Sequence, residues 1–174
     1  MGAVLHRRPP TTESGVVTDA DQLPPIPTHA EVEADPGVLC TFNERIVAAF
    51  RARGGVVGGP FAGADVLLLT TSGARTGAIR VVPLEYFRVD GRLVVLGTYG
   101  GAPRHPAWVH NLRAHPNVTV EVGQRSFPAV AHEITGADAD CTYQAIAARS
   151  PRVARYPTPR RRIPVFALHE RESG

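Results

Sequence analysis

Apolar residues recur at helical spacing in one stretch near the start of the chain. In residues 38–53 they stand three or four positions apart, and Gly54 and Gly55 follow as a helix end. Residues 1–36 show no such period and are rich in Pro, Thr, Asp and Glu, a composition typical of a flexible arm. The pattern therefore predicts an arm over residues 1–36 and then an amphipathic helix.

The middle of the chain has the pattern of β-structure. Residues 64–71 predict a strand around the apolar run Val66–Leu69, dense enough to be buried on both faces. Residues 79–89 and 92–99 predict two further strands, because Asp90 and Gly91 between them are a typical hairpin turn. These segments predict neighbouring antiparallel strands.

The second half of the chain alternates between short helices and strands. Its predicted elements are a helix over 106–114 with proline in its first turn, a hairpin of strands 118–122 and 126–134, a helix over 137–149, an irregular basic segment over 152–162 and a last strand over 163–169. Strands joined by tight turns form an antiparallel sheet, and a sheet this small tends to close into a barrel. We therefore expect an α+β barrel with flanking helices as one domain over residues 37–170, and a short tail over 171–174.

Composition agrees with a single globular domain. The chain has 174 residues, of which 43% are apolar and 20% are charged. No window approaches the roughly 18 apolar residues that a membrane span needs. Arg7, Arg8, Pro9 and Pro10 interrupt any secretory apolar region at the start. We therefore expect no membrane span and a cytoplasmic location.

The two cysteines, Cys40 and Cys141, are far apart in the sequence. One long-range disulfide stays open, but two free thiols in a reducing compartment are the favoured interpretation. No paired-cysteine or His-x-x-x-His spacing points to zinc, so no metal site is expected.

The formal charge of +3 is modest, and all 19 basic residues are arginine. Aromatic residues make up only 6% and the arginines are scattered, so the pattern does not favour a nucleic acid as partner. A few arginines are better suited to a small anionic ligand.

The turn between the first two predicted strands is the first candidate site. Residues 70–77 combine hydroxyls, two glycines and Arg75, and they lead to Arg80. Glycines let backbone N–H groups converge on an anion, and the arginines add charge-assisted contacts. A solvated hairpin loop explains the same pattern equally well. The segment is not a P-loop, because the required Gly-Lys-Ser/Thr is missing.

A second candidate site runs over residues 98–112, where a strand leads through Gly100 and Gly101 into a helix. The start of that helix offers free backbone donors to negative charge. Trp108, taken alone, reads as a core anchor. His105, His110 and His115 are five positions apart, which does not place them on one helix face.

Three further residues carry candidate chemistry. Tyr143 and Tyr156 lie near an arginine-rich segment that either closes over a pocket or is a solvated loop, and the loop is favoured. Glu85 stands among strand residues, where a proton donor with a raised pKa is conceivable but an edge position or an ion pair is favoured.

Two long motifs together resemble a known family. They are Leu68-Leu69-Thr70-Thr71-Ser72-Gly73-x-Arg75-Thr76-Gly77-x-x-Arg80-Val81-x-Pro83-Leu84 and Gly100-Gly101-Ala102-Pro103-x-His105-Pro106-x-Trp108-x-x-Asn111-Leu112. In order and separation they are similar to the deazaflavin-dependent nitroreductase family of actinobacteria, which has a split β-barrel fold. The resemblance extends over residues 42–168.

The resemblance implies coenzyme F420, a flavin analogue with a phosphate and an acidic oligoglutamate tail. The implied cofactor residues are Ala74, Arg75 and Thr76 at the phosphate; Arg80, Val81, Val82, Pro83 and Leu84 beneath the cofactor; Leu96, Gly97, Thr98 and Tyr99 along the deazaflavin; and Ala107, Trp108, Val109, His110 and Asn111 around its ring system and side chain. In this interpretation Trp108 becomes a wall of the cofactor site.

The resemblance also implies the reaction. Family members pass a hydride from reduced F420 to activated C=C bonds, quinones and nitroaromatics, so an F420H2-dependent reductase is expected, with a natural-product intermediate as a further candidate substrate. Tyr156 and Glu85 are the candidate catalytic side chains. Ala74, Tyr99 and Glu85 depart from the family pattern, and nitroimidazole activation is not predicted. The alternatives are an FMN-binding split-barrel oxidoreductase, a cofactor binder and a redox-neutral biosynthetic enzyme, in each case a monomer or a homodimer.

Overall fold

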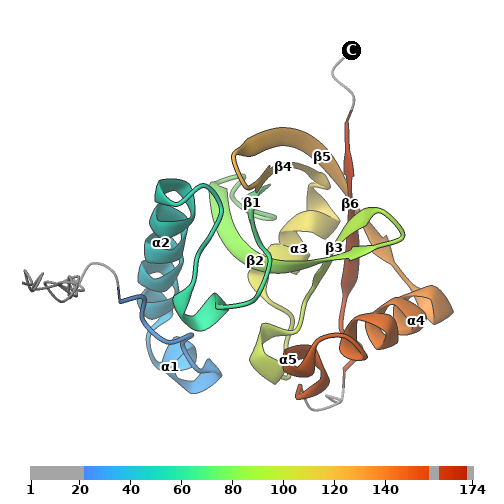
Figure 1. Ribbon diagram of the computed structural model, residues 1–174, viewed down its shortest axis with the longest axis horizontal. Helices are drawn as coiled ribbons and strands as arrows, with labels where there is room; N and C mark the ends of the chain where they lie inside the picture. Colours follow the sequence, from blue (N-terminus) through green and yellow to red (C-terminus); the bar gives the residue numbers. More distant parts are fainter. Residues whose placement is uncertain (1–21, 157–160, 172–174) are drawn as a thin grey trace, which may run out of the picture.

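Six antiparallel strands close into a barrel in the computed structural model, which describes residues 22–156 and 161–171 (Figure 1). The strands are β1 (Val66–Ser72), β2 (Ile79–Val89), β3 (Arg92–Leu96), β4 (Asn117–Val122), β5 (Arg125–Ile134) and β6 (Val165–Glu170). Their order around the barrel is β1-β2-β3-β6-β5-β4, and β4 pairs with β1 to complete it. The expected α+β barrel is therefore confirmed.

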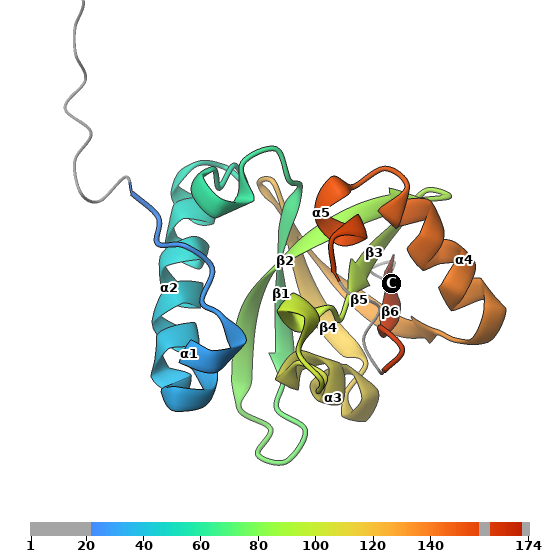
Figure 2. The same ribbon diagram turned by 90° about the horizontal axis from the view of Figure 1, so that it is seen from below.

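Helices cover two sides of the barrel. Figures 1 and 2 show α2 along β1 and β2, and α4 with α5 on the opposite side. The helices are α1 (His29–Ala34), α2 (Pro36–Ala52), α3 (Ala107–Ala114), α4 (Gly136–Ala147) and α5 (Pro151–Ala154), with short 3₁₀ turns at Gly59–Phe61 and Tyr99–Gly101. Three hydrophobic clusters result, one inside the barrel, one under α2 and one under α4.

Strand β1 contains the apolar run Val66–Leu69 and is covered on both faces. Leu67 and Leu69 point into the barrel, while Val66 and Leu68 pack under α2, and all four are buried. Side chains alternate between the two faces of a strand, so a strand covered on both faces must be apolar throughout. Burying each leucine contributes about 1.5–3 kcal/mol.

The segment expected as an arm over residues 1–36 contains a helix in the part that the structure describes. Helix α1 lies within it, and Thr28 begins this helix with a capping box in which its side chain and that of Glu31 each bond the other's backbone N–H. Asp35 then caps α2 by accepting from the Gly37 amide. A short helix fixed by caps needs no long apolar period, so periodicity missed it. Residues 1–21 lie outside the described residues.

The irregular segment expected over 152–162 also differs. Its first part is α5, whose N-cap Ser150 accepts a hydrogen bond from the Val153 amide, and residues 157–160 are not among those described. Strand β3 ends at Leu96, earlier than expected, and the chain turns there into the 3₁₀ turn. Of the tail expected over 171–174, Arg171 follows β6 and residues 172–174 lie outside the described residues.

Cys40 in α2 and Cys141 in α4 are free and exposed, as expected. No group of three or more His, Cys, Asp or Glu side chains in the described part of the chain is arranged to hold a metal ion. No helix within residues 22–156 and 161–171 is long and apolar enough to span a membrane.

Candidate functional site

The loop between β1 and β2 is a tight turn, and the two arginines in and next to it make few contacts. Gly73 N–H donates to Ala78 O and Gly77 N–H donates to Gly73 O, both at 2.8 Å, and Gly77 has the left-handed φ of 67° that favours glycine. Within the described residues no hydrogen bond, ion pair or ring contact holds the Arg75 guanidinium. Arg80 makes only a 3.5 Å contact to the carbonyl of its neighbour Ile79.

Asn111 ties this loop to helix α3. Its Oδ1 accepts a hydrogen bond from Ala74 N–H at 3.0 Å, and its Nδ2 donates to Thr71 Oγ1 at 3.2 Å. Asn111 and Thr71 are the two buried polar side chains of the described core, with 9% and 1% of their surface exposed. Buried polar groups are retained only when hydrogen-bonded, so this link fixes the loop beside the helix. The structure thus brings together the predicted residues Ala74 and Asn111.

Helix α3 begins next to a close-packed turn. Its N-cap Pro106 makes no side-chain cap, and Val109 N–H donates to Pro106 O at 3.1 Å, which leaves the amides of Ala107 and Trp108 without a partner within the helix. A Cβ on Gly97 would lie 3.0 Å from Val109 Cγ2 and 3.1 Å from Pro164 Cδ. Gly97 is therefore required for the close packing of β3 against α3 and the segment before β6.

Tyr99 has a left-handed φ of 47°, which is unusual for a residue other than glycine. Strain of this kind persists only where the surroundings hold it, and it clusters at functional sites. Helix α1 contacts the same turn. The His29 and Tyr99 rings meet edge to face with centroids 5.7 Å apart, Glu33 lies 3.7 Å from Arg104, and His29 Nδ1 is buried without a partner.

Arg161 crosslinks the same turn to the segment before β6. Its guanidinium donates to the backbone carbonyls of Gly97, Thr98 and Ala102 at 2.8–3.1 Å, and Nη1 lies 3.0 Å from His105 Nδ1. No local pattern distinguishes Arg161 from the neighbouring arginines, because only the fold determines which one turns inward.

Several other residues expected at the cofactor pack into the hydrophobic clusters. Trp108 is 6% exposed and its ring meets Phe166 inside the barrel at 5.9 Å, as for a core anchor. Leu96 packs in the cluster under α4. Strand β2 alternates, so Val82 packs against the barrel interior while Val81 packs under α2. The remaining members keep their strand and helix positions: Thr76 exposed in the loop, Pro83 and Leu84 on β2, Thr98 in the turn, and Val109 and His110 on α3.

The two candidate catalytic residues lie near α5. Glu85 lines a hollow of about 490 Å³ with Asp65, Arg149 and Arg152, and its carboxylate is 3.8 Å from the Arg152 guanidinium. Burial raises the pKa of Glu85, Arg152 opposes that rise and Asp65 adds to it. Tyr156 follows α5, where its N–H donates to Val153 O at 3.1 Å.

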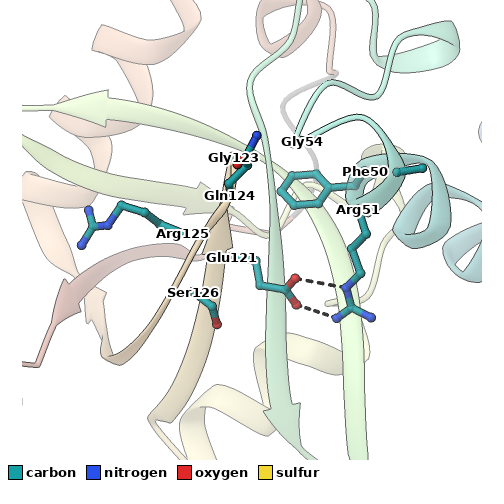
Figure 3. A pocket seen from close by; sticks show the side chains of 9 residues that line it. Phe50, Arg51, Gly54, Glu121, Gly123, Gln124, Arg125 and Ser126 are labelled. Carbon is teal, nitrogen blue, oxygen red and sulfur yellow. Dashed lines mark hydrogen bonds and ion pairs between the residues drawn. The ribbon is translucent and has the colours of Figure 1, made fainter.

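A second hollow, of about 420 Å³, contains none of the predicted site residues (Figure 3). Arg51 and Glu121 form a two-armed ion pair there, at 3.1 and 2.6 Å. A Cβ on Gly55 would lie 2.5 Å from Gly123 Cα, so the end of α2 touches the β4–β5 hairpin closely. This hollow marks a packing junction at the barrel end away from the β1–β2 loop.

The fold places the chain among the split barrels. A solved F420-H2 dependent reductase, FDR-A, superposes with a TM-score of 0.53 at 34% identity, covering 60% of this chain and 93% of that one. A second solved structure, described as a domain-swapped dimer, gives a TM-score of 0.55 at 26% identity over 80% of this chain and 96% of that one.

A model of the F420H(2)-dependent quinone reductase family matches residues 43–170, and the chain belongs to that family. This confirms the deazaflavin-dependent family that the two motifs resemble. The F420H(2)-dependent quinone reductase of Mycobacterium tuberculosis is 37% identical over 94 residues, which are 53% of this chain and 63% of the relative. The match thus spans less than two thirds of the length of that relative.

Proposed function

We propose that the protein binds coenzyme F420 and is an F420H2-dependent reductase, with quinones as the first class of acceptor to test. The observation that carries this proposal is the β1–β2 loop, which is anchored to Asn111 of α3 and carries the unengaged Arg75, with Arg80 just after it on β2. Family membership supplies the identity of the anion that such a loop would bind.

The residues present fit the chemistry of F420. Its phosphate and glutamate tail are anionic, and Arg75 and Arg80 are cations without a carboxylate partner in the described part of the chain. The amides of Ala107 and Trp108 at the start of α3 add dipoles that favour negative charge or a polarised carbonyl. The strained Tyr99 and the buried, unpartnered His29 Nδ1 lie at the turn that the resemblance places along the deazaflavin.

Bound F420H2 would supply the hydride, so the protein's own side chains need only orient the acceptor and handle a proton. Tyr156 and Glu85 are proposed to face the acceptor. Burial raises the pKa of Glu85, which suits a carboxylic acid that delivers a proton to an acceptor oxygen as negative charge develops there. Activated C=C bonds, nitro groups and a natural-product intermediate remain further candidate acceptors.

FMN is the alternative cofactor, and Arg75 in the β1–β2 loop with Arg80 on β2 favours the more acidic F420. A monomer or a homodimer is proposed, since one structural neighbour is described as a domain-swapped dimer. The exposed free thiols of Cys40 and Cys141 favour a reducing compartment such as the cytoplasm.

The test is a fluorescence titration of the purified protein with oxidised F420 and, in parallel, with FMN. The variants are Arg75→Ala with Arg80→Ala, and a control pair, Arg92→Ala with Arg125→Ala, which removes the same charge at the other end of the barrel. We expect saturable binding of F420 that the first pair loses and the control pair keeps. Preference for FMN, or equal loss in both pairs, would contradict the proposal.

A further inference from the structure

Arg161 stands apart from its neighbour in the same short segment. It is partly buried and directs its guanidinium inward, with Nε 2.8 Å from Ala102 O, Nη2 2.9 Å from Thr98 O and both Nη atoms 3.1 Å from Gly97 O. Arg162, next in the chain, is exposed and pairs with Asp140 at 2.6 Å. Arg161 thus donates to the backbone of a single turn, whereas the adjacent Arg162 does not.

The turn over residues 97–102 needs such an external hold. Its own hydrogen bonds are only Gly101 N–H to Thr98 O and Ala102 N–H to Tyr99 O, both at 3.0 Å. Tyr99 and Gly100 both have left-handed φ, at 47° and 61°. A planar guanidinium can donate to several carbonyls at once, and these charge-assisted bonds offset the strain of the turn. The compact ammonium of a lysine cannot reproduce that fork.

We propose that Arg161 is a positioning residue of the cofactor site, which holds the turn of residues 97–102 in the conformation that binds F420. The inference rests on the proposed function, because it assigns Arg161 to the same site. Arg161 acts through Gly97, Thr98 and Tyr99, and His105 completes its hydrogen bonding.

His105 makes this hold sensitive to pH. Arg161 has only donors, so His105 Nδ1 must accept and the ring must be the neutral tautomer with its proton on Nε2. Burial lowers the pKa of His105, and the charges of Arg161, Arg113 and His110 lower it further while Glu133 opposes them. Protonation would remove the acceptor and set two cations against each other. F420 affinity should therefore fall in acid.

The test compares Arg161→Lys with the control Arg162→Lys, both of which keep the charge. Affinity for oxidised F420 is measured by fluorescence titration, well below each melting temperature, together with the KM for F420H2 and kcat with a quinone. We expect Arg161→Lys to weaken F420 binding by about tenfold or more and to raise the KM similarly, because charge-assisted hydrogen bonds to the turn are lost, with kcat changed far less. Arg162→Lys should match the wild type.

A second variant, His105→Asn, keeps an oxygen acceptor near the position of Nδ1 but does not titrate. Its F420 affinity should fall less than that of the wild type as the pH is lowered from about 7.5 to well below the ordinary histidine pKa of about 6.5. Unchanged F420 affinity in Arg161→Lys, or the same acid loss in His105→Asn, overturns the inference while the proposed function stands. A wild type that binds no F420 overturns both.

Discussion

Replacing Asn111 tests whether the link between the β1–β2 loop and α3 serves a ligand. Asn111→Ala removes hydrogen bonds to Ala74 N–H and Thr71 Oγ1. Ala74 is exposed and can bond water, whereas Thr71 is 1% exposed and leaves its hydroxyl buried. Two lost bonds and one unsatisfied buried group cost about 2–3 kcal/mol. For a chain of this length that lowers the melting temperature by about 4–12 °C.

Asn111→Asp keeps hydrogen-bond acceptors in this link but adds a charge. A carboxylate can accept from both Ala74 N–H and the Thr71 hydroxyl, although burying its charge costs stability. The added negative charge beside an anion site should nevertheless weaken F420 binding more than alanine does. Asn117→Ala, an exposed change at the start of β4, is the control. The reasoning is refuted if Asn111→Asp binds F420 as tightly as the wild type, or if Asn111→Ala loses stability without losing affinity.

Three further predictions follow from single contacts. Burial raises the pKa of Glu85 in the folded state, so ionisation of this carboxyl disfavours folding. Its contribution to the free energy of unfolding therefore falls as the pH rises from its pKa in the unfolded chain through its pKa in the folded protein. Denaturant titrations of Glu85→Gln should lack that fall, and a pH profile identical to that of the wild type would contradict the prediction. Gly97→Ala places a methyl group 3.0 Å from Val109 Cγ2, and thermal unfolding and F420 titration should show a loss of about 1–3 kcal/mol of stability together with weaker binding. Arg51→Ala breaks the ion pair with Glu121, in which Arg51 is 53% exposed, so urea unfolding should register less than about 1 kcal/mol and F420 affinity should not change.

The barrel strands were predictable because their signals are local. Asp90 and Gly91 adopt φ of 49° and 76°, as their hairpin turn requires, and the register from Tyr86–Val95 to Val89–Arg92 follows from it. The short helices α1 and α5 were missed because caps at Thr28 and Ser150, rather than apolar periods, define them.

The candidate site was only partly predictable, since its decisive contacts join distant segments. Asn111 could be named from its motif, but its bond to Ala74 exists only because α3 folds against the end of β1. Arg161 carries no local pattern at all. Trp108 was easier to predict, because it lies among apolar residues of the same helix, Val109 and Leu112, and its ring packs against Phe166 in the same cluster.

The most direct test of the central claim is the consumption of F420H2 by the purified protein in the presence of a soluble quinone. The wild type should oxidise F420H2 only when the quinone is present, and the Arg75→Ala, Arg80→Ala double variant should show a raised KM for F420H2 with the protein still folded. No quinone-dependent oxidation by a wild type that binds F420 would contradict the reductase, and an unchanged KM in the double variant would contradict the site.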